Sequence, residues 1–272
     1  MTFVLTFVSW EEIGIVTKQI RIILLITILI ISAIIAIVYI CLIKNKEIIY
    51  ENGNSRITIC YNDIIKIAFR KKKKHNKKII VIPVNTCFDT IIDEDISKVK
   101  KPLVSLESIH GKWIKEITAR GMSSDELDKR IKNSLKKQEL YPISVIPENE
   151  KTRGKREEFA KGTIAIINEN ENTYFYLFAL SKFDEHNNSQ PLKEDFIQII
   201  HKLISFYNRN GQGYELYLPL MGTNLSRIGI SHEEALTILE SSFKLYSDEI
   251  HGKINIIIYN KEKNKVAICK NK

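Results

Sequence analysis

The chain has 272 residues, enough for one domain of ordinary size with an appendage or for two small domains. Its formal net charge of +9 at pH 7 indicates an anionic partner, but charge alone does not choose among a nucleotide, a nucleic acid and an anionic lipid. The four cysteines form no C-x-x-C pair and the six histidines show no metal-binding spacing, which excludes a disulfide framework and predicts no metal or cofactor.

Residues 22–43 form an uncharged run of mainly Ile, Leu, Val and Ala, bracketed by Arg21 and Lys44. At about 1.5 Å per residue, such a helix is long enough to cross a hydrocarbon core of about 30 Å. The run is longer than the apolar region of a signal peptide and no small-residue cleavage site is visible, so we interpret it as a retained membrane anchor. A buried core helix, the alternative, rarely has every face apolar over this length.

Positive charge predicts the orientation of the anchor. Residues 44–46 and 70–78 carry more Lys and Arg than Lys18 and Arg21 on the other side, so the soluble part is expected in the cytoplasm. The run at 70–78 is interpreted as a solvated loop, with contact to anionic lipid as the alternative. The apolar residues 1–8 are too short to span and either lie at the interface or belong to a first membrane helix. We divide the chain into a membrane region, residues 1–46, and a cytoplasmic domain, residues 47–272.

Strands and helices alternate behind the anchor. Sequence patterns predict strands at residues 56–60, 79–84, 162–167, 173–181, 214–219 and 253–259, with an edge strand at 266–269. The 3.6-residue period predicts helices at residues 109–117, 123–137 and 191–210 and after Ser231, and residues 142–156 are expected to form a loop. The continuous apolar run at 79–84 is typical of a central strand covered on both faces. This order predicts an α/β fold, a three-layer α/β/α sandwich with a mixed sheet.

The stretch at residues 216–231 contains a buried strand, a glycine-containing loop and a helix that Ser231 caps. Such a turn aims backbone N–H groups outward, and Gly222 and Asn224 tolerate close approach of an anion. The pattern predicts either a phosphate cradle or an ordinary strand-to-helix turn.

Three landmarks occur in a recognisable order: a strand ending in Asp63 and Ile64, an apolar strand ending in Asn85, and a late strand that runs into residues 219–224. This order resembles the macro domain, an ADP-ribose-binding fold, over residues 55–270. The segments at residues 83–90, 108–111, 161–163 and 219–223 are similar to one branch of it, the membrane-anchored macro-domain form of the Thoeris antiphage effector.

The resemblance implies a role for each residue of the ligand site. Asp63, with Ile64 beside it, would accept a hydrogen bond from the adenine amine; the alternative for Asp63 is a helix N-cap. Asn85, with Asp89 of the same segment, would contact the distal ribose or its substituent; the alternative is a turn-forming Asn. His110 and Gly111 would occupy the first phosphate-side loop, with a structural histidine as the alternative. The backbone of Gly222, Thr223, Asn224, Leu225 and Ser226 would wrap the diphosphate, and Arg227 would add charge or be solvated.

The sequence also departs from hydrolytic macro domains, which carry a second Asn followed by a glycine-rich run. Phe88 holds the second position here and no glycine triplet follows, while Asn224 replaces the second glycine of the usual G-x-G. Catalysis without the groups that position water loses its preorganisation, whereas binding does not. We therefore expect a receptor without catalytic residues.

The resemblance implies a signal-gated effector in the bacterial inner membrane, with its macro domain in the cytoplasm. A TIR-domain partner would convert NAD into an ADP-ribose conjugate, such as histidine–ADP-ribose. Its binding would cause homo-oligomerisation, and clustered membrane helices would disrupt the bilayer and bring about abortive infection. One alternative is a membrane-tethered ADP-ribosyl hydrolase acting on modified proteins. Another is a binder of nucleic acid or anionic lipid that depends on the basic run at 70–78.

Overall fold

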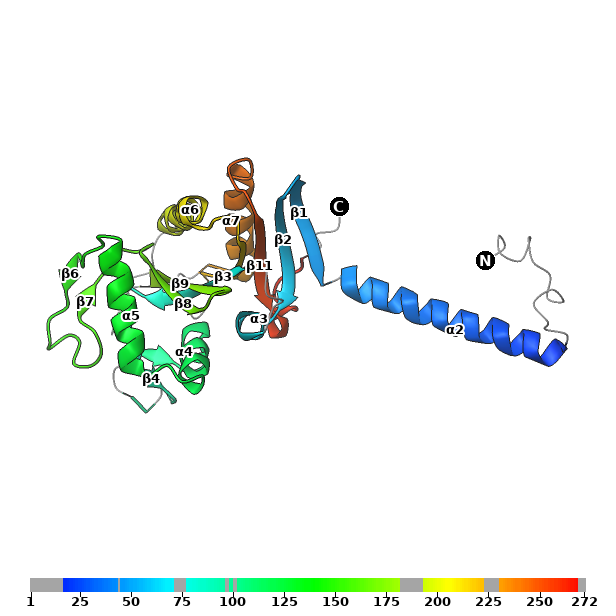
Figure 1. Cartoon of the computed structure of the whole chain (residues 1–272), viewed down its shortest axis with the longest axis horizontal. Coiled ribbons are helices and arrows are strands. Elements are labelled where there is room, and N and C mark those ends of the chain that lie inside the picture. Colours follow the sequence, from blue (N-terminus) through cyan, green and yellow to red (C-terminus); the bar gives the residue numbers. More distant parts are fainter. Residues whose placement is uncertain are drawn as a thin grey trace. The chain divides into compact units, whose positions relative to one another are not determined.

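The computed structural model describes residues 17–43, 45–70, 77–95, 98–99, 102–181, 193–222 and 230–268. The chain divides into two compact units, Met1–Lys46 and Glu47–Lys272, and Figure 1 labels their elements.

The first unit contains helix α2 (Lys18–Ile43), which begins four residues before the predicted span. Its stretch Ile22–Tyr39 has a mean hydropathy of 3.2 and is wholly unburied, so by length and composition this helix is suited to cross a membrane. The two hydroxyl side chains within it are satisfied internally. Thr27 donates to the carbonyl of Ile23 and Ser32 to that of Leu29, both at 2.9 Å, as a hydroxyl in an apolar medium requires.

The second unit is built on a seven-stranded sheet in the order β1-β2-β11-β10-β3-β9-β8. The strands are β1 (Lys46–Asn52), β2 (Ser55–Asn62), β3 (Lys78–Asn85), β8 (Ile164–Asn170), β9 (Thr173–Ser181), β10 (Glu215–Pro219) and β11 (Lys253–Tyr259). The central strands β2, β11, β10, β3 and β9 run parallel, and β8 pairs antiparallel with β9. The mixed sheet and the predicted hairpin are thus confirmed.

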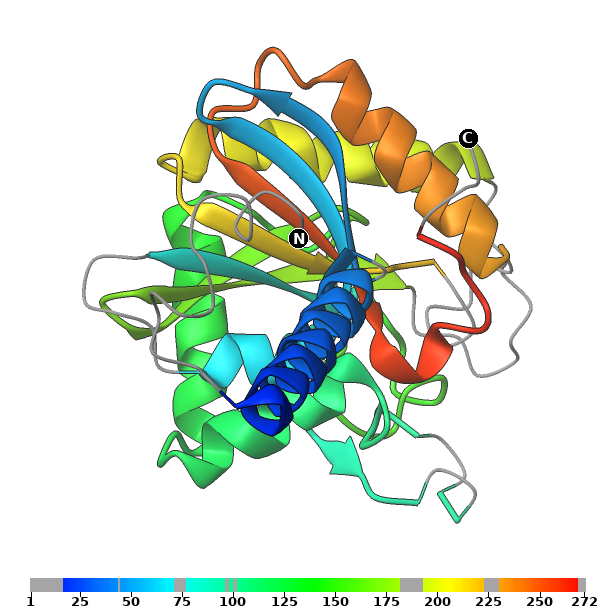
Figure 2. The same ribbon diagram turned by 90° about the vertical axis from the view of Figure 1, so that its right-hand side faces the viewer.

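Helices cover both faces of the sheet. They are α3 (Ile64–Phe69), α4 (Ile109–Ala119), α5 (Ser124–Lys137), α6 (Lys193–Asn210) and α7 (His232–Leu245), with a short 3-10 turn η1 (Asn260–Glu262). In Figure 2, α6 and α7 (yellow and orange) lie on one side of the sheet and α4 and α5 (green) on the other. The three-layer prediction is confirmed.

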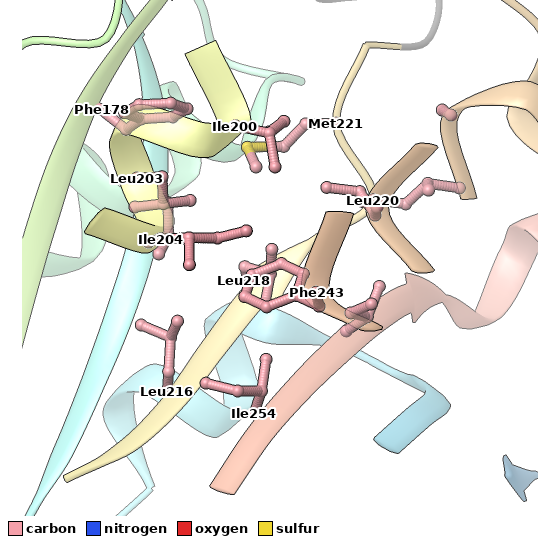
Figure 3. Close-up of a cluster of buried hydrophobic side chains, with 14 of the residues drawn as sticks. Phe178, Ile200, Leu203, Ile204, Leu216, Leu218, Leu220, Met221, Phe243 and Ile254 are labelled. Carbon is pink, nitrogen blue, oxygen red and sulfur yellow. The ribbon is translucent and has the colours of Figure 1, made fainter. Parts of the chain in front are cut away.

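Strand β3 contributes to the core on both faces, as its continuous apolar sequence predicts. Ile79 and Val81 belong to the cluster that faces α6 and α7, whereas Ile80 and Ile82 belong to the cluster that faces α4 and α5. All four side chains are no more than 1% exposed. Figure 3 shows part of the first cluster, including Leu203 and Ile204 of α6, Leu216 and Leu218 of β10, and Phe243 of α7.

The predicted capping box of α7 is present. Ser231 Oγ accepts from the Glu234 backbone N–H, and a Glu234 carboxylate oxygen accepts from the Ser231 N–H, both at 3.1 Å. Ser108 Oγ and Ser123 Oγ cap α4 and α5 by accepting from the backbone N–H groups of Gly111 and Glu126. These local bonds fix where each helix begins.

Several elements differ from the sequence-based prediction. Strand β1 was not expected, nor were the small pairs β4 (Ile92–Asp93) with β5 (Val104–Ser105) and β6 (Ser144–Val145) with β7 (Glu157–Glu158). The predicted edge strand at 266–269 is wrong for its described residues. Val266 and Ile268 are buried in the core, and their backbone bonds to the Tyr61 hydroxyl instead of to a strand.

Candidate functional site

A cavity of about 690 Å³ lies at the carboxyl ends of the parallel strands. Five strands contribute to its wall: Asn62 from β2, Pro83 and Val84 from β3, Leu180 and Ser181 from β9, Pro219 from β10 with Leu220 after it, and Ile257 and Tyr259 from β11. Helices α3 and α4 complete the wall. Ligands of open α/β sheets bind at this edge, and binding sites for small molecules occupy about 300–1,000 Å³.

Asp63 lines the cavity as the N-cap of α3. Its Oδ1 accepts from the backbone N–H groups of Ile65 at 2.9 Å and Lys66 at 3.3 Å. The N-cap alternative is therefore observed. The adenine contact stays a prediction, and it would use Oδ2, the other carboxylate oxygen of Asp63. Ile64, 5% exposed, also lines the cavity.

The buried side chain of Lys78 holds the other end of α3. Its Nζ donates to the backbone carbonyls of Ile67 at 2.6 Å, Ala68 at 2.5 Å and Arg70 at 3.1 Å, although the residue is only 1% exposed. A cation at a helix C-terminus also interacts favourably with the helix dipole. The short helix that presents Asp63 is thus fixed at both ends.

Asn85 and Asp89 bond to each other. Asn85 Nδ2 donates to Asp89 Oδ2 at 2.9 Å, and the Asp89 N–H donates to Asn85 Oδ1 at 3.1 Å. The pairing of β3 with β9 shifts register between Val84 and Asn85, so a bulge turns the chain away where the cavity begins. Neither Asn85 nor Asp89 is among the residues that line the cavity.

A second segment holds this loop through a buried ion pair that the sequence did not predict. Lys151 Nζ lies 2.6 Å from Asp89 Oδ2, with the two side chains 1% and 0% exposed. The backbone N–H of Lys155 donates to Asp89 Oδ1 at 2.8 Å, and its Nζ donates to the Phe88 carbonyl at 2.6 Å. We call Asp89, Lys151 and Lys155 the clamp. A buried carboxylate is tolerated when it is paired and hydrogen-bonded in this manner.

Phe88 and Cys87 lie in the interior beside the clamp. Phe88, at φ +53°, is 1% exposed and packs edge-on against Phe159, with ring centroids 5.6 Å apart. Burial raises the pKa of the Cys87 thiol, so it stays protonated and unreactive at neutral pH. The clamped loop therefore has a packed apolar interior.

His110 lines the cavity at the first turn of α4. It is 6% exposed, it stacks on Trp113 with centroids 6.3 Å apart, and no hydrogen bond joins its ring to the residues that the structure describes. Burial, and then the charge of Lys155, lowers the pKa of His110 to about 3. The imidazole is thus neutral at pH 7 and offers one donor and one acceptor.

Gly111 is required by packing. A Cβ there would lie 2.2 Å from the backbone oxygen of Ser105, so only glycine allows α4 to approach β5 this closely. Its N–H donates to Ser108 Oγ at 3.0 Å. Gly111 is not among the residues that line the cavity.

Asn85 ends β3, and Gly222 follows the neighbouring parallel strand β10. Register pairs Tyr217 of β10 with Ile80 of β3, so both sites follow carboxyl ends at the same edge of the sheet. Gly222 has φ +94°, and a Cβ would meet Ile230 Cδ1 at 2.8 Å. Five predicted cradle residues lie outside the described residues, so their roles stay predictions: Thr223, Asn224, Leu225, Ser226 and Arg227.

Tyr259 is a site residue that the sequence analysis missed. It ends β11, is 38% exposed and lines the cavity. Lys112 Nζ lies 5.9 Å from its ring centroid and 3.4 Å from a Glu107 carboxylate oxygen. An exposed aromatic ring in such a wall can stack on a planar base. The available signal was an aromatic residue at the end of the last strand.

Comparison with known proteins gives the family. The family model described as Thoeris protein ThsA, macro domain, matches residues 57–259. The chain belongs to the Thoeris ThsA macro-domain family. It is 25% identical over 279 residues to Thoeris protein ThsA from Bacillus amyloliquefaciens (strain Y2), covering 99% of this chain and 84% of that protein.

Solved macrodomains are also similar. A mutant macrodomain from Oceanobacillus iheyensis aligns with a TM-score of 0.49 and 11% identity, covering 80% of this chain and 87% of that one. The same macrodomain with ADP aligns with a TM-score of 0.43 and 13% identity, covering 81% and 95%. Family membership makes the protein an antiphage defence effector whose macro domain is the sensor of an ADP-ribose-derived ligand.

Among the residues that the structure describes, the wall of the cavity in this ThsA macro domain carries no excess of positive charge. Three lysines (Lys66, Lys112 and Lys115) and four carboxylates (Asp63, Glu107, Glu116 and Glu262) line it, which gives these residues a formal net charge of −1. Glu262 is held by His232, whose Nε2 lies 3.1 Å from its Oε1. From this part of the wall, backbone N–H groups and helix N-termini are the groups suited to bind an anion.

Proposed function

We propose that this macro domain binds an ADP-ribose conjugate, such as histidine–ADP-ribose, and that the chain acts as a signal-gated membrane effector. The observation that carries the proposal is the cavity of about 690 Å³ at the carboxyl edge of the sheet, in a Thoeris ThsA family member. It combines an exposed aromatic ring, a carboxylate and a helix N-terminus, which suit a base, an amine and a phosphate.

The adenine binds at the end of the cavity formed by Tyr259 and Asp63. Tyr259 stacks on the base, an interaction that contributes about 1–3 kcal/mol per base. Asp63 uses Oδ1 for the α3 cap, so Oδ2 accepts from the exocyclic amine. Ile64 and Ile257 supply apolar surface in the same wall.

The diphosphate binds near the first turn of α4 and the backbone of residues 222–227. The described residues of the cavity wall have a formal net charge of −1, so their side chains do not supply the main attraction. The positive end of the α4 dipole and backbone N–H groups supply it instead. His110, neutral and without a hydrogen bond to the described residues, donates one N–H to the ligand.

The loop after β3 supports a receptor over a hydrolase. The amide of Asn85 is engaged by Asp89, and Phe88 is buried in the core. Neither side chain is available to orient a water molecule against the distal ribose. Binding without hydrolysis suits a sensor, because the signal persists until the ligand dissociates.

Ligand binding then drives assembly and membrane damage. A TIR-domain partner makes the conjugate from NAD, domains associate, and clustered α2 helices disrupt the bilayer at the inner membrane. The ligand must prefer the assembled state, and a preference of about 5.5 kcal/mol moves a population from 1:99 to 99:1. The apolar stretch Ile22–Tyr39 supports the membrane location.

The binding proposal is tested by calorimetric titration of the purified full-length protein in detergent. We expect histidine–ADP-ribose or ADP-ribose to bind below millimolar concentration, and Tyr259→Ala to weaken binding about 5- to 150-fold, as loss of one stacking contact predicts. Tyr50→Ala is the matched control, because Tyr50 lies on β1 and outside the cavity wall. Absence of binding by every conjugate tested would defeat the proposal.

The hydrolase alternative needs a separate assay. We expect no release of ADP-ribose from an ADP-ribosylated protein incubated with the full-length chain. Release that disappears in Asn85→Ala would replace the receptor with an enzyme.

A further inference from the structure

The two ends of the ligand cavity belong to different strands of the sheet. In the order β2-β11-β10-β3-β9, Asp63 follows β2 and Tyr259 ends β11. Val84 of β3 and Ser181 of β9 line the cavity at the far side of that order. We call the first pair the adenine end and the second pair the distal end. With the adenine at its proposed place, the distal end is left for the part of the ligand beyond the diphosphate.

A buried lysine lies behind each end. Lys78 and Lys151 are both 1% exposed, and a lysine is almost never this buried unless it is paired. Lys78 Nζ donates to three carbonyls at the C-terminus of α3, the helix that presents Asp63. Lys151 Nζ is paired with Asp89 in the loop after β3. Neither lysine is among the residues that line the cavity, so each acts through the backbone that it holds.

Hydrogen bonds connect the segment after Lys151 to the distal end through Thr86. The Thr86 N–H donates to the carbonyl of Ser181, a residue of the cavity wall, at 2.9 Å. The Thr86 carbonyl accepts from the Phe159 N–H at 3.0 Å, and Thr86 Oγ1 donates to Glu158 Oε1 at 3.2 Å. The wall, the loop after β3 and the segment at residues 151–159 therefore form one hydrogen-bonded unit.

The clamp packs this unit closely. Gly154 has φ +74°, and a Cβ there would lie 2.3 Å from Asp89 Oδ1, so the backbone lies directly against the buried carboxylate. Lys155 is near enough to His110 of the cavity wall for its charge to add to burial in lowering the pKa of that imidazole. The position of the loop beside the distal end therefore depends on residues that follow it by more than 60 positions in sequence.

We propose that Lys78 and Lys151 are positioning residues for the two ends of the ligand. Lys78 fixes the adenine end through α3, and Lys151 fixes the distal end through the clamp. A wall that is already in its binding conformation does not have to be ordered when the ligand arrives, and this raises affinity. The inference rests on the proposed function, because it assigns the two ends of that ligand to two residues behind the wall.

Calorimetric titration of the full-length protein in detergent with ADP and with ADP-ribose tests the proposal. The two ligands differ only by the distal ribose. We expect Lys151→Met to weaken ADP-ribose binding about tenfold and ADP binding less than about twofold, because only the distal wall loses its preorganisation. Lys78→Met should weaken both ligands to the same extent. A variant that is merely less stable has no means of distinguishing the two ligands.

Two further variants complete the titration. Arg156→Met is the matched control, because Arg156 lies in the same segment but its exposed side chain pairs with Glu148, and it should change neither affinity. Thr86→Val removes only the hydroxyl bond to Glu158 and should also weaken ADP-ribose more than ADP, so the test does not depend on the folding of Lys151→Met. Equal losses for both ligands in Lys151→Met and Thr86→Val would overturn the proposal.

Amide hydrogen exchange tests the two lysines without a ligand. In peptides covering residues 85–90, Lys151→Met should raise the exchange rate at least tenfold, since local opening becomes easier there, and it should leave residues 64–69 of α3 unchanged. Lys78→Met should give the reverse pattern. If neither ADP nor any ADP-ribose conjugate binds but exchange follows this pattern, the proposed function fails while each lysine still fixes its own end. Equal acceleration of both segments in both variants contradicts the proposal whether or not a ligand binds.

Discussion

The buried clamp gives a quantitative prediction about the loop beside the ligand cavity. Lys151→Met keeps the length and apolar stem of the side chain but removes its charge. Asp89, which is 0% exposed, then loses the cation 2.6 Å from its Oδ2. We expect the free energy of unfolding of the soluble domain to fall.

The size of the loss follows from what remains around Asp89. Removing one member of a buried ion pair costs about 3–5 kcal/mol because the other charge stays buried. Two donors remain, Asn85 Nδ2 at 2.9 Å and the Lys155 N–H at 2.8 Å, so we place the loss near the lower end, about 3 kcal/mol. Against a domain stability of roughly 5–15 kcal/mol, this is a large fraction.

Urea unfolding of a Trp10→Phe background of the full-length chain, followed by the fluorescence of Trp113, measures the effect. Lys132→Met, an exposed lysine on α5, is the control and should change stability by no more than about 0.5 kcal/mol. Asp89→Asn combined with Lys151→Met removes the unpaired charge and should recover part of the loss. A decrease in the free energy of unfolding of less than about 1 kcal/mol for Lys151→Met would refute the reasoning, because leaving a buried carboxylate unpaired costs more than this.

Three further predictions address the cavity and the anchor. Burial lowers the pKa of His110 from its ordinary 6.5 to about 3, so below pH 6.5 the unfolded chain binds a proton that the folded chain does not. As the pH falls below 6.5, this group therefore lowers the free energy of unfolding by up to about 1.4 kcal/mol for each pH unit. His110→Gln should make the urea midpoint depend less on pH between 6.5 and 4. Gly222→Val should destabilise the domain by about 1–3 kcal/mol and abolish conjugate binding, because its φ is +94° and a Cβ meets Ile230 at 2.8 Å; normal binding would contradict the cradle. Deleting residues 1–46 should keep conjugate binding but remove toxicity in cells, and a toxic truncated form would place the damaging activity in the macro domain.

Local patterns predicted most of the fold. The continuous apolar run of β3 gave a strand buried on both faces, and the Ser231 and Glu234 spacing gave the capping box of α7. Both features depend on residues close in sequence, where periodicity and capping chemistry act directly. Strand β1 escaped prediction because it is an exposed edge strand with weak alternation, directly after the apolar helix α2 in sequence.

Long-range contacts explain what the sequence did not predict at the site. Asn85 and Asp89 were predicted to bind ligand. Their bonds to each other are local, but the bond of Asp89 to Lys151, 62 residues later, depends on the tertiary fold. In sequence, Lys151 is one charge within a polar stretch and carries no sign of burial. Tyr259 was missed for a related reason, since only the order of strands in the sheet brings the end of β11 beside Asp63.

A structure of the protein with bound histidine–ADP-ribose tests the central claim most directly. We predict the adenine between Tyr259 and Asp63 and the diphosphate at the first turn of α4. Occupancy instead of the second cavity, of about 1310 Å³ and lined by Tyr50, Tyr214 and His251, would contradict the account.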